Sequence, residues 1–381
     1  MNSNLYKYTL RDPYFSNKEN MWIITRYKDV KQLIHGESLS NNLFVEKITD
    51  YTENNLSPIE KIKMLWLNTF DLPEHSIPRR AFDDLFSKKQ INLYKDAIND
   101  LASQTASSLA TLKEFDLIKR YAIPLPIKII MHIFDIDNDD YSIIKSLLND
   151  FTLFTSNSPS DPTLERANKA ADTLYHYFKK LIGERANQSD DVIGKLLNNE
   201  NIIQSLTRDQ IIANLVMLLW GGQITTTHLT GLGIYTLLKN QDQLHLLLDD
   251  SQYYNSMVEE LLRFTSPTQM IMRKAKEDLE ISGKTIAKND YVRLVLYTAN
   301  RDPEKFQNPN DFNVRREPNQ HLAFGSGTHF CIGANLARFT LPTIIRNILS
   351  TFPLMSMPTQ NISYHKSSVL PGIDKLIIHT K

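Results

Sequence analysis

The chain has 381 residues, and its 43 lysines and arginines are balanced by 43 aspartates and glutamates. This balance gives no electrostatic reason to expect nucleic acid or an anionic membrane as the main partner. A single cysteine excludes an intramolecular disulfide, and the first fifteen residues have neither the basic start nor the apolar run of a secretory signal. We therefore expect a cytoplasmic protein.

No feature of the sequence divides the chain into parts. It has no linker rich in Gly, Ser or Pro, no repeat and no low-complexity run. Its longest apolar stretch, 211–222, is interrupted by Asn214 and is too short to span a bilayer. The sequence therefore predicts a single domain over residues 1–381, without a membrane anchor.

Apolar residues three and four positions apart predict helices along most of the chain. The clearest helices lie at residues 88–112, 164–186 and 253–265. Strand signals are few, and they are short β-branched runs near Gly, Pro or Asp. They fall at residues 22–27, 290–298 and 372–380. The predicted fold class is mainly α with small β-sheets.

One predicted helix stands out by its length. Thr207 and Gln210 form a capping-box start, and the apolar pattern runs from Ile211 to about Leu238. Such a helix is roughly 45–50 Å long and must cross the domain. Its middle, WGGQITTTHLTG at 220–231, predicts a local distortion where a ligand approaches the backbone. A helix–helix crossing, where small residues also serve, is an equally good interpretation.

The lone cysteine, Cys331, lies in the stretch HLAFGSGTHFCIGANLARFTL, residues 321–341. Gly325 and Gly327 permit a tight path, partly at positive φ, against a flat ligand, and Gly333 keeps the next turn clear. Cys331 falls at the start of a predicted helix, whose free N–H groups favour the thiolate form of a cysteine. A lone cysteine is more often a small buried residue, but these neighbours indicate an axial metal ligand.

The loop FGSGTHFCIG resembles the haem-binding loop of the cytochromes P450 of the soluble bacterial type. The stretch EELLR supports this resemblance, since Glu260 and Arg263 match the family's Glu-x-x-Arg, and 300–316 is similar to the segment that supplies a second arginine, here Arg316. Further similar segments lie at 22–34, 71–82, 190–197 and 369–376. The resemblance implies the P450 fold, with a long central helix over a haem, and a structural role for Glu260 and Arg263.

The resemblance also implies the cofactor and its ligands. The expected cofactor is haem b (iron protoporphyrin IX), with the Cys331 thiolate as the ligand of its iron. Its buried propionates need cationic or hydrogen-bonding partners, and the matching residues are His75, Arg79, Arg273 and His329. The full set of expected cofactor-binding residues is His75, Arg79, Arg273, Phe324, His329, Gly222 and Gly333.

The same resemblance assigns oxygen activation to the middle of the long helix, with Thr225 and Gln223 as the expected catalytic residues. In the family, an acid and an alcohol at adjacent positions deliver protons to this site. Here the acid position holds Ile224, which cannot relay a proton, and no Asp or Glu lies between Asp209 and Asp242. Three explanations stay open: Gln223 and water organise delivery, the substrate supplies a polar group, or the reaction needs no such relay.

The expected substrate is a medium-sized organic molecule of the secondary-metabolite type. By resemblance, its expected contact residues are Trp220, Gly221, Met270, Ile271 and Val369. An ordinary core position is an equally good interpretation of Trp220.

Electrons are expected from a ferredoxin and a ferredoxin reductase, because the sequence has no flavin or iron–sulfur segment. A basic face for the partner would be formed by Arg79, Arg80, Lys88, Lys89 and Arg338, and we expect a monomer. Three alternatives to an oxygen-dependent monooxygenase are open: peroxide-driven or other non-hydroxylating P450 chemistry, a non-enzymatic haem sensor or carrier, and a haem-free protein with a structural cysteine.

Overall fold

The computed structural model describes residues 7–43, 56–156, 160–185, 192–199, 202, 205–365 and 367–380. The described residues form two compact units. Unit 1 draws on residues 1–40, 96–123 and 225–381, and unit 2 on residues 41–95 and 124–224. The single domain expected over 1–381 stays a prediction.

Unit 2 is helical in its described residues. Its helices are α3 (Pro58–Met64), α4 (Ser76–Asp83), α5 (Lys88–Leu93), α7 (Pro124–Ile133), α8 (Tyr141–Thr152), α9 (Asp161–Arg185), α10 (Val192–Leu197) and the first part of α12 (Arg208–Lys239). The longest helix that lies wholly within it, α9, packs against α3, α8 and α10. Its buried face consists of Ala167, Ala170, Ala171, Leu174, Phe178 and Ile182, spaced three and four apart as an amphipathic helix requires.

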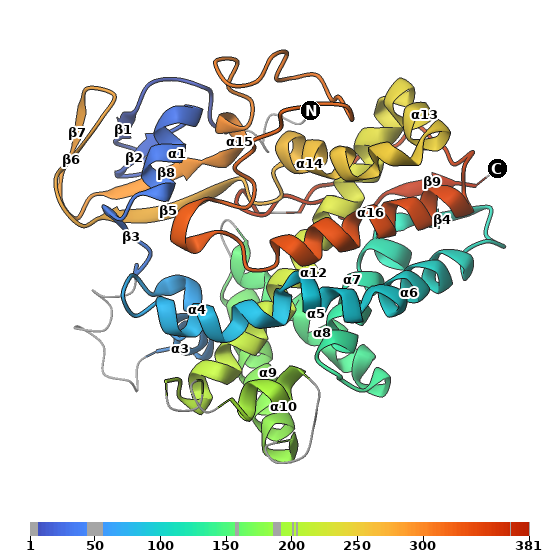
Figure 1. Cartoon of the computed structure of the whole chain (residues 1–381), viewed down its shortest axis with the longest axis horizontal. Helices are drawn as coiled ribbons and strands as arrows, with labels where there is room; N and C mark the ends of the chain where they lie inside the picture. Colours follow the sequence, from blue (N-terminus) through green and yellow to red (C-terminus); the bar gives the residue numbers. More distant parts are fainter. Residues whose placement is uncertain are drawn as a thin grey trace. The chain divides into compact units, whose positions relative to one another are not determined.

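Unit 1 contains the sheets (Figure 1). The strands are β1 (Tyr14–Ser16), β2 (Met21–Ile24), β3 (Leu39–Ser40), β4 (Glu114–Asp116), β5 (Met270–Ala275), β6 (Leu279–Ile281), β7 (Lys284–Ile286), β8 (Tyr291–Val295) and β9 (Ile377–His379). Five of them form a sheet in the order β1-β2-β8-β5-β3, in which only β2 and β8 are parallel. The other two sheets are the pairs β4-β9 and β6-β7. This arrangement confirms the prediction of a mainly α protein with small sheets.

Unit 1 also contains helices. They are α1 (Tyr27–His35), α6 (Lys95–Ser107), the second part of α12, α13 (Gln241–Asp249), α14 (Tyr254–Thr265), α15 (Leu296–Ala299) and α16 (Ala334–Thr351). Helix α1 packs against α15 and β8, while α14 packs against α16. A buried cluster fills the space between α1 and the large sheet, and it includes Val30, Leu33, Val292 and Leu294.

Helix α12 is continuous from Arg208 to Lys239. Its predicted capping box is present: Gln210 N donates to the Thr207 hydroxyl at 3.1 Å, and Thr207 N donates to the Gln210 side chain at 2.9 Å. The expected local distortion does not interrupt the helix. Two of its glycines instead allow close packing, because a Cβ at Gly222 or Gly231 would lie 3.0 or 2.5 Å from an isoleucine Cδ1, of Ile130 or Ile118 respectively. This packing favours the helix-crossing interpretation for those two positions.

Several predicted elements differ in extent. The helix expected at 88–112 is split at Tyr94 into α5 and α6, and the strands expected at 22–27 and 290–298 end at Ile24 and Val295. The first strand ends early because α1 starts at Tyr27, whose N–H donates to the Asp302 carboxylate at 2.8 Å. This contact spans 275 residues of sequence, so local patterns do not reveal it.

Candidate active site

The cysteine loop connects Leu322 to α16 and is shaped by two glycines. Gly325 and Gly327 have φ of 72° and 70°, in the left-handed region that favours glycine. A Cβ at Gly327 would also lie 3.0 Å from Cα of His35, so the loop and α1 approach closely there. The sequence-based prediction of a tight, positive-φ path is confirmed at these two positions.

The loop presents Cys331 as an exposed thiol. The Cys331 N–H donates to the Phe324 carbonyl at 2.9 Å, and the Cys331 carbonyl accepts the Ala334 N–H at 3.2 Å. Cys331 therefore lies just before α16, which begins at Ala334 with Gly333 as its N-cap. A Cβ at Gly333 would lie 4.0 Å from the Cys331 Sγ. The loop thus brings together four expected site residues: Phe324, His329, Cys331 and Gly333.

A buried ion cluster joins α14 to the segment that precedes the loop. Arg263 donates to both Glu260 oxygens at 2.7 Å, and both side chains are fully buried. Arg316 Nε also donates to Glu260, at 3.0 and 3.1 Å. Arg263 further donates to the carbonyls of Asn300, Pro309 and Asp311. These contacts fit the structural role expected for Glu260, Arg263 and Arg316.

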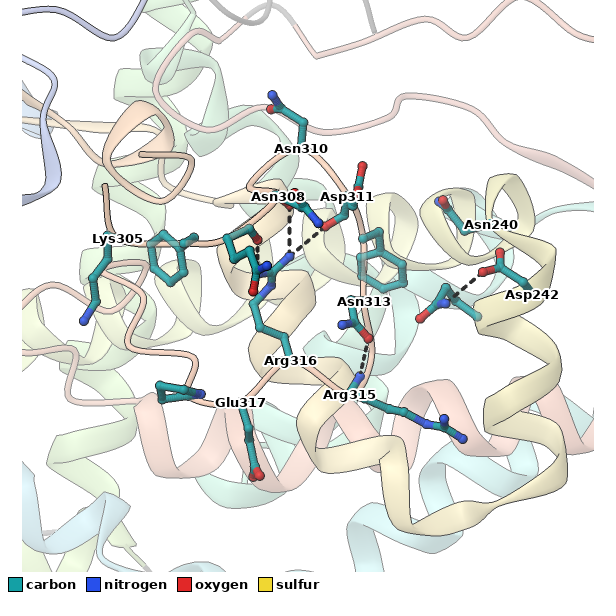
Figure 2. A pocket seen from close by; sticks show the side chains of 15 residues that line it. Asn240, Asp242, Lys305, Asn308, Asn310, Asp311, Asn313, Arg315, Arg316 and Glu317 are labelled. Atoms are coloured by element: carbon teal, nitrogen blue, oxygen red, sulfur yellow. Dashed lines mark hydrogen bonds between the residues drawn. The ribbon is translucent and has the colours of Figure 1, made fainter. Parts of the chain in front are cut away.

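A polar cavity of about 780 Å³ lies next to this cluster. Figure 2 shows Arg316 among its lining side chains, with Asp242 and Asn240 on the other side. The Arg316 guanidinium donates to the backbone carbonyls of Gln307, Asn308 and Asp311. The cavity contains none of the residues expected to act in catalysis, and Arg316, one of its two lining arginines, is engaged in holding the backbone.

Strand β5 carries three more of the expected residues. Arg273 pairs in register with Val292 of β8, and its guanidinium donates to the Met272 carbonyl at 2.8 Å. Met270 belongs to a buried cluster with Tyr8, Ile23 and Val295, and Ile271 packs against the main core of the sheet. Both therefore have a packing function, and their contact with substrate stays a prediction. Val369 is 41% exposed, and its carbonyl accepts the Gln269 N–H next to the start of β5.

In unit 2, His75 and Arg79 lie at the start of α4. His75 is the N-cap and is 1% exposed, and its carbonyl accepts the Arg79 N–H at 3.0 Å. Burial, followed by the charge of Arg79, lowers the pKa of His75. Arg79 Nε donates to the Asp83 carboxylate at 2.8 Å. Pairing with Asp83 partly offsets the positive charge that was expected to meet a propionate.

Trp220 belongs to an aromatic cluster in unit 2. Its ring stacks on Trp66 with centroids 5.8 Å apart, and it lies 5.9 and 5.2 Å from the rings of Phe151 and Phe154. The indole N–H donates to the Thr152 hydroxyl at 3.1 Å. Trp220 is half-buried, so both interpretations, pocket wall and core, remain compatible with this packing.

The expected catalytic residues follow Trp220 on α12. Gln223 and Ile224 are 4% and 5% exposed, and Thr225 is half-buried. A Cβ at Gly221 would meet no atom within 4 Å, in contrast to Gly222. There is thus open space beside Gly221, while Gly222 packs against Ile130.

Two groups of side chains near the site form contacts that were not predicted from the sequence, although Arg338 was expected in the basic face. One is the cluster of Glu259, His321 and Arg338 beside the cysteine loop. Its only sequence signal is position, since Glu259 precedes Glu260, and His321 and Arg338 flank the loop.

The other group is a pair of histidines, of which His228 is buried and His365 is half-buried. The rings of His228 on α12 and His365 have centroids 5.5 Å apart. Burial, and then the charge of His365, lower the pKa of His228 to about 3. A Cβ at Gly372 would overlap the His228 ring, so the 364–373 hairpin packs directly against α12.

A model of the family described as Cytochrome P450 matches residues 86–376. The chain belongs to the cytochrome P450 family. A polyketide biosynthesis P450, PksS of Bacillus subtilis, is 29% identical over 370 residues, which cover 93% of this chain and 88% of the relative. This P450 is accordingly an oxidoreductase of the monooxygenase type, which uses haem iron and binds small-molecule substrates and redox partners.

Two solved structures extend the similarity. P450BioI, in complex with an acyl carrier protein ligated to hexadec-9Z-enoic acid, has a TM-score of 0.88 and 26% identity, covering 95% of this chain and 92% of that chain. CYP109E1 from Bacillus megaterium, in complex with testosterone, has a TM-score of 0.86 and 26% identity, and the match covers 97% of this chain and 94% of that chain. These matches confirm the P450 fold.

The cysteine loop fits a haem iron. The described part of the chain has no group of three or more His, Cys, Asp or Glu side chains that could hold a metal ion. A haem would need no such group, because its porphyrin would hold the iron and the protein would supply a single ligand position. The exposed Cys331 thiol, in a loop shaped by two positive-φ glycines, is suited to that position.

Among the described helices, none combines the length and the apolar character needed to cross a membrane.

Proposed function

We propose that this P450 is a monooxygenase that oxidises a medium-sized organic substrate of the secondary-metabolite type. It would use O2 and electrons from a ferredoxin and a ferredoxin reductase, and act as a monomer. The observation that carries the proposal is the cysteine loop, in which Gly325 and Gly327 hold positive φ and Cys331 is exposed. The relatives support the substrate class, since one is named for polyketide biosynthesis and others are solved with a fatty acyl carrier protein or testosterone.

The proposed cofactor is haem b, with Cys331 as the iron ligand. When bound, it supplies the redox-active iron at which oxygen is activated, and thiolate ligation favours O–O cleavage. We assign the propionates to His75, Arg79, Arg273 and His329, and the other haem contacts to Phe324, Gly222 and Gly333. Because Arg79 is paired with Asp83, Arg273 is expected to contribute more to propionate binding.

The proposed proton delivery differs from that of the family. Ile224 is buried and has no exchangeable proton on its side chain, so it can only exclude water. The Thr225 hydroxyl can hold a water molecule and pass on its proton, and the Gln223 amide can hold a water molecule by hydrogen bonds. We propose that a polar group of the native substrate completes this relay. Trp220, Gly221, Met270, Ile271 and Val369 are the proposed substrate contacts.

Substrate binding and coupled turnover test this proposal. A library that includes intermediates made by neighbouring genes is screened for a shift of the haem spin state. Compounds that shift it are then incubated with O2, NAD(P)H, ferredoxin and reductase. Oxygenated product formed in proportion to NAD(P)H consumed supports a monooxygenase, whereas ligands that shift the spin state without any product indicate a haem carrier or sensor.

Ile224 also favours a second candidate, a peroxide-driven or non-hydroxylating reaction, because such chemistry does not need protons delivered to O2. Hydrogen peroxide alone would then support turnover as well as the ferredoxin system does. In that case, Thr225→Ala would leave the rate with either oxidant unchanged. A strong preference for O2 and electrons, lost in Thr225→Ala, would exclude this candidate.

A further inference from the structure

A polar cluster lies beside the cysteine loop, and the proposed monooxygenase reaction assigns it no role. It consists of Glu259 on α14, His321 before the loop and Arg338 on α16, all in unit 1. Arg338 binds Glu259 with two hydrogen bonds, from Nε to Oε1 at 2.8 Å and from Nη2 to Oε2 at 2.9 Å. This bidentate geometry fixes the guanidinium in place more firmly than a single contact would.

His321 contacts the same carboxylate, at the oxygen Oε2 that also accepts a hydrogen bond from Arg338 Nη2. Its Nδ1 accepts the Ala323 N–H at 3.2 Å, so the proton of the neutral ring resides on Nε2. Nε2 lies 3.2 Å from Glu259 Oε2 and donates to it. The His321 side chain is only 2% exposed. Within the cluster, Glu259 carries a negative charge and Arg338 a positive one.

The cluster is connected to the haem ligand through Phe324. The Arg338 guanidinium carbon lies 4.8 Å from the centroid of the Phe324 ring, and the His321 ring centroid lies 5.9 Å from it. The Phe324 carbonyl in turn accepts the Cys331 N–H at 2.9 Å. The Arg338 cation thus packs on Phe324, whose carbonyl binds the backbone N–H of Cys331, the proposed iron ligand.

The ionisation of the two groups is stable. Burial acts to raise the pKa of Glu259, but hydrogen bonds from His321 and Arg338 outweigh it and lower that pKa to about 2. The Glu259 hydrogen bond raises the pKa of Arg338, and attraction to Cys331 adds to this effect. Both groups are therefore charged at neutral pH, and Arg338 interacts electrostatically with Cys331.

We propose that Arg338 and Glu259 are positioning residues that set the electrostatic potential at the Cys331 ligand and thereby the reduction potential of the haem. This inference rests on the proposed ligation of haem by Cys331. Reduction adds one negative charge at the iron, so the Arg338 cation favours the reduced state and the Glu259 anion opposes it. The effects of Arg338 and Glu259 on the reduction potential are opposite in sign and partly cancel.

The competing function for Arg338 is docking of an acidic ferredoxin, as the sequence suggested. Its side chain is 40% exposed, and Glu259, which binds it, is 27% exposed. Because Glu259 compensates the charge, Arg338 presents less positive potential to a partner than an unpaired arginine does. The two functions predict different results for the isolated protein, since docking affects only the complex.

The test compares the haem midpoint potentials of wild type, Arg338→Gln, Glu259→Gln and the double variant, by spectroelectrochemistry on the holoprotein. Arg346→Gln is the matched control, because Arg346 is also on α16 but packs on Tyr254. Arg338→Gln should lower the equilibrium constant for reduction at least threefold, and Glu259→Gln should raise it at least threefold. A threefold change is about 28 mV for one electron. The double variant and the control should stay near the wild type.

Each other outcome overturns the inference. Equal potentials in all five proteins, or shifts of the same sign in both single variants, contradict the electrostatic balance. Unchanged potentials with weaker ferredoxin binding in Arg338→Gln alone assign this arginine to docking. The failure of the proposed function is distinguishable, because wild type would then lack the red-shifted Soret band of its reduced carbon monoxide complex, whereas failure of this inference alone leaves that band intact.

Discussion

At the scale of single residues, the replacement of an acid by Ile224 is the feature that most affects chemistry. The side chain is 5% exposed and lies between Gln223 and Thr225, the two polar residues proposed to hold the relay. An isoleucine there keeps the site apolar and supplies no proton. Under the proposed mechanism, oxygen activation depends on what Thr225, Gln223, water and the substrate provide.

Restoring the acid should reveal this dependence. In Ile224→Asp, the product formed per NAD(P)H consumed should rise severalfold for substrate analogues stripped of their polar group, and should change little for the native substrate. Thr225→Ala should uncouple turnover in either background, with more hydrogen peroxide released. Product and peroxide are measured by chromatography and a peroxide assay. Equal coupling of both substrate types in wild type would contradict a substrate-assisted relay.

Arg263 provides a second test at this scale. It is fully buried against Glu260, so Arg263→Ala leaves a buried carboxylate with Arg316 as its remaining ionic partner. The free energy of unfolding should fall by about 3–5 kcal/mol. The control, Arg315→Ala, removes an exposed arginine that packs on Tyr253, and should cost about 1 kcal/mol or less. Urea titrations measure both; a similar small loss in the two variants would show that the buried cluster is not structural.

At the scale of elements, the hairpin closed by Tyr364 and Ile373 packs on α12 through a pair of histidine rings. The His228 and His365 rings lie against each other, and Gly372 leaves space for the His228 ring. Backbone hydrogen bonding from His365 N to Gly372 O, at 2.9 Å, closes the hairpin. The hairpin carries Val369, so this packing also positions one of the proposed substrate contacts.

This packing should make stability depend on pH. Burial keeps His228 neutral, with a pKa near 3 in the folded state against an ordinary value of 6.5, and it also lowers the pKa of His365. Below about pH 6.5 the unfolded chain binds protons that the folded chain does not, so stability falls as pH decreases from 6.5 towards 5. Each histidine kept neutral contributes up to roughly 1.4 kcal/mol per pH unit to this slope.

Replacing the buried histidine isolates its contribution. His228→Asn should make the loss of unfolding free energy between pH 6.5 and 5 shallower, as measured by urea titrations across that range. His176→Asn is the control, because the His176 side chain is 61% exposed, and its slope should match that of wild type. Parallel slopes for all three proteins would show that His228 does not stay neutral in the folded state.

At the scale of the whole molecule, elements with strong local patterns were predictable from sequence. Helices α9 and α14 coincide closely with the expected ranges 164–186 and 253–265, and α12 has the expected start and length. The break between α5 and α6 was not predictable, because no glycine or proline marks Tyr94. The early end of β2 depends on Asp302, which is remote in sequence.

The same distinction applies to the site. Cys331 and its glycines occupy one contiguous loop, so their spacing alone indicates their function. The cluster around Arg338 joins residues 62 and 79 positions apart, and no local pattern reveals such contacts. The cysteine loop is thus predictable from sequence, whereas the groups that surround it require the fold.

The central claim is that Cys331 ligates a haem iron as a thiolate. The most direct measurement is the absorption spectrum of the reduced protein with carbon monoxide, for wild type and Cys331→Ser. The account predicts a strongly red-shifted Soret band in freshly prepared wild type and the loss of that shift in the variant, because no other cysteine is present to replace the ligand. An unshifted band in wild type, or an equally shifted band in Cys331→Ser, would contradict the account.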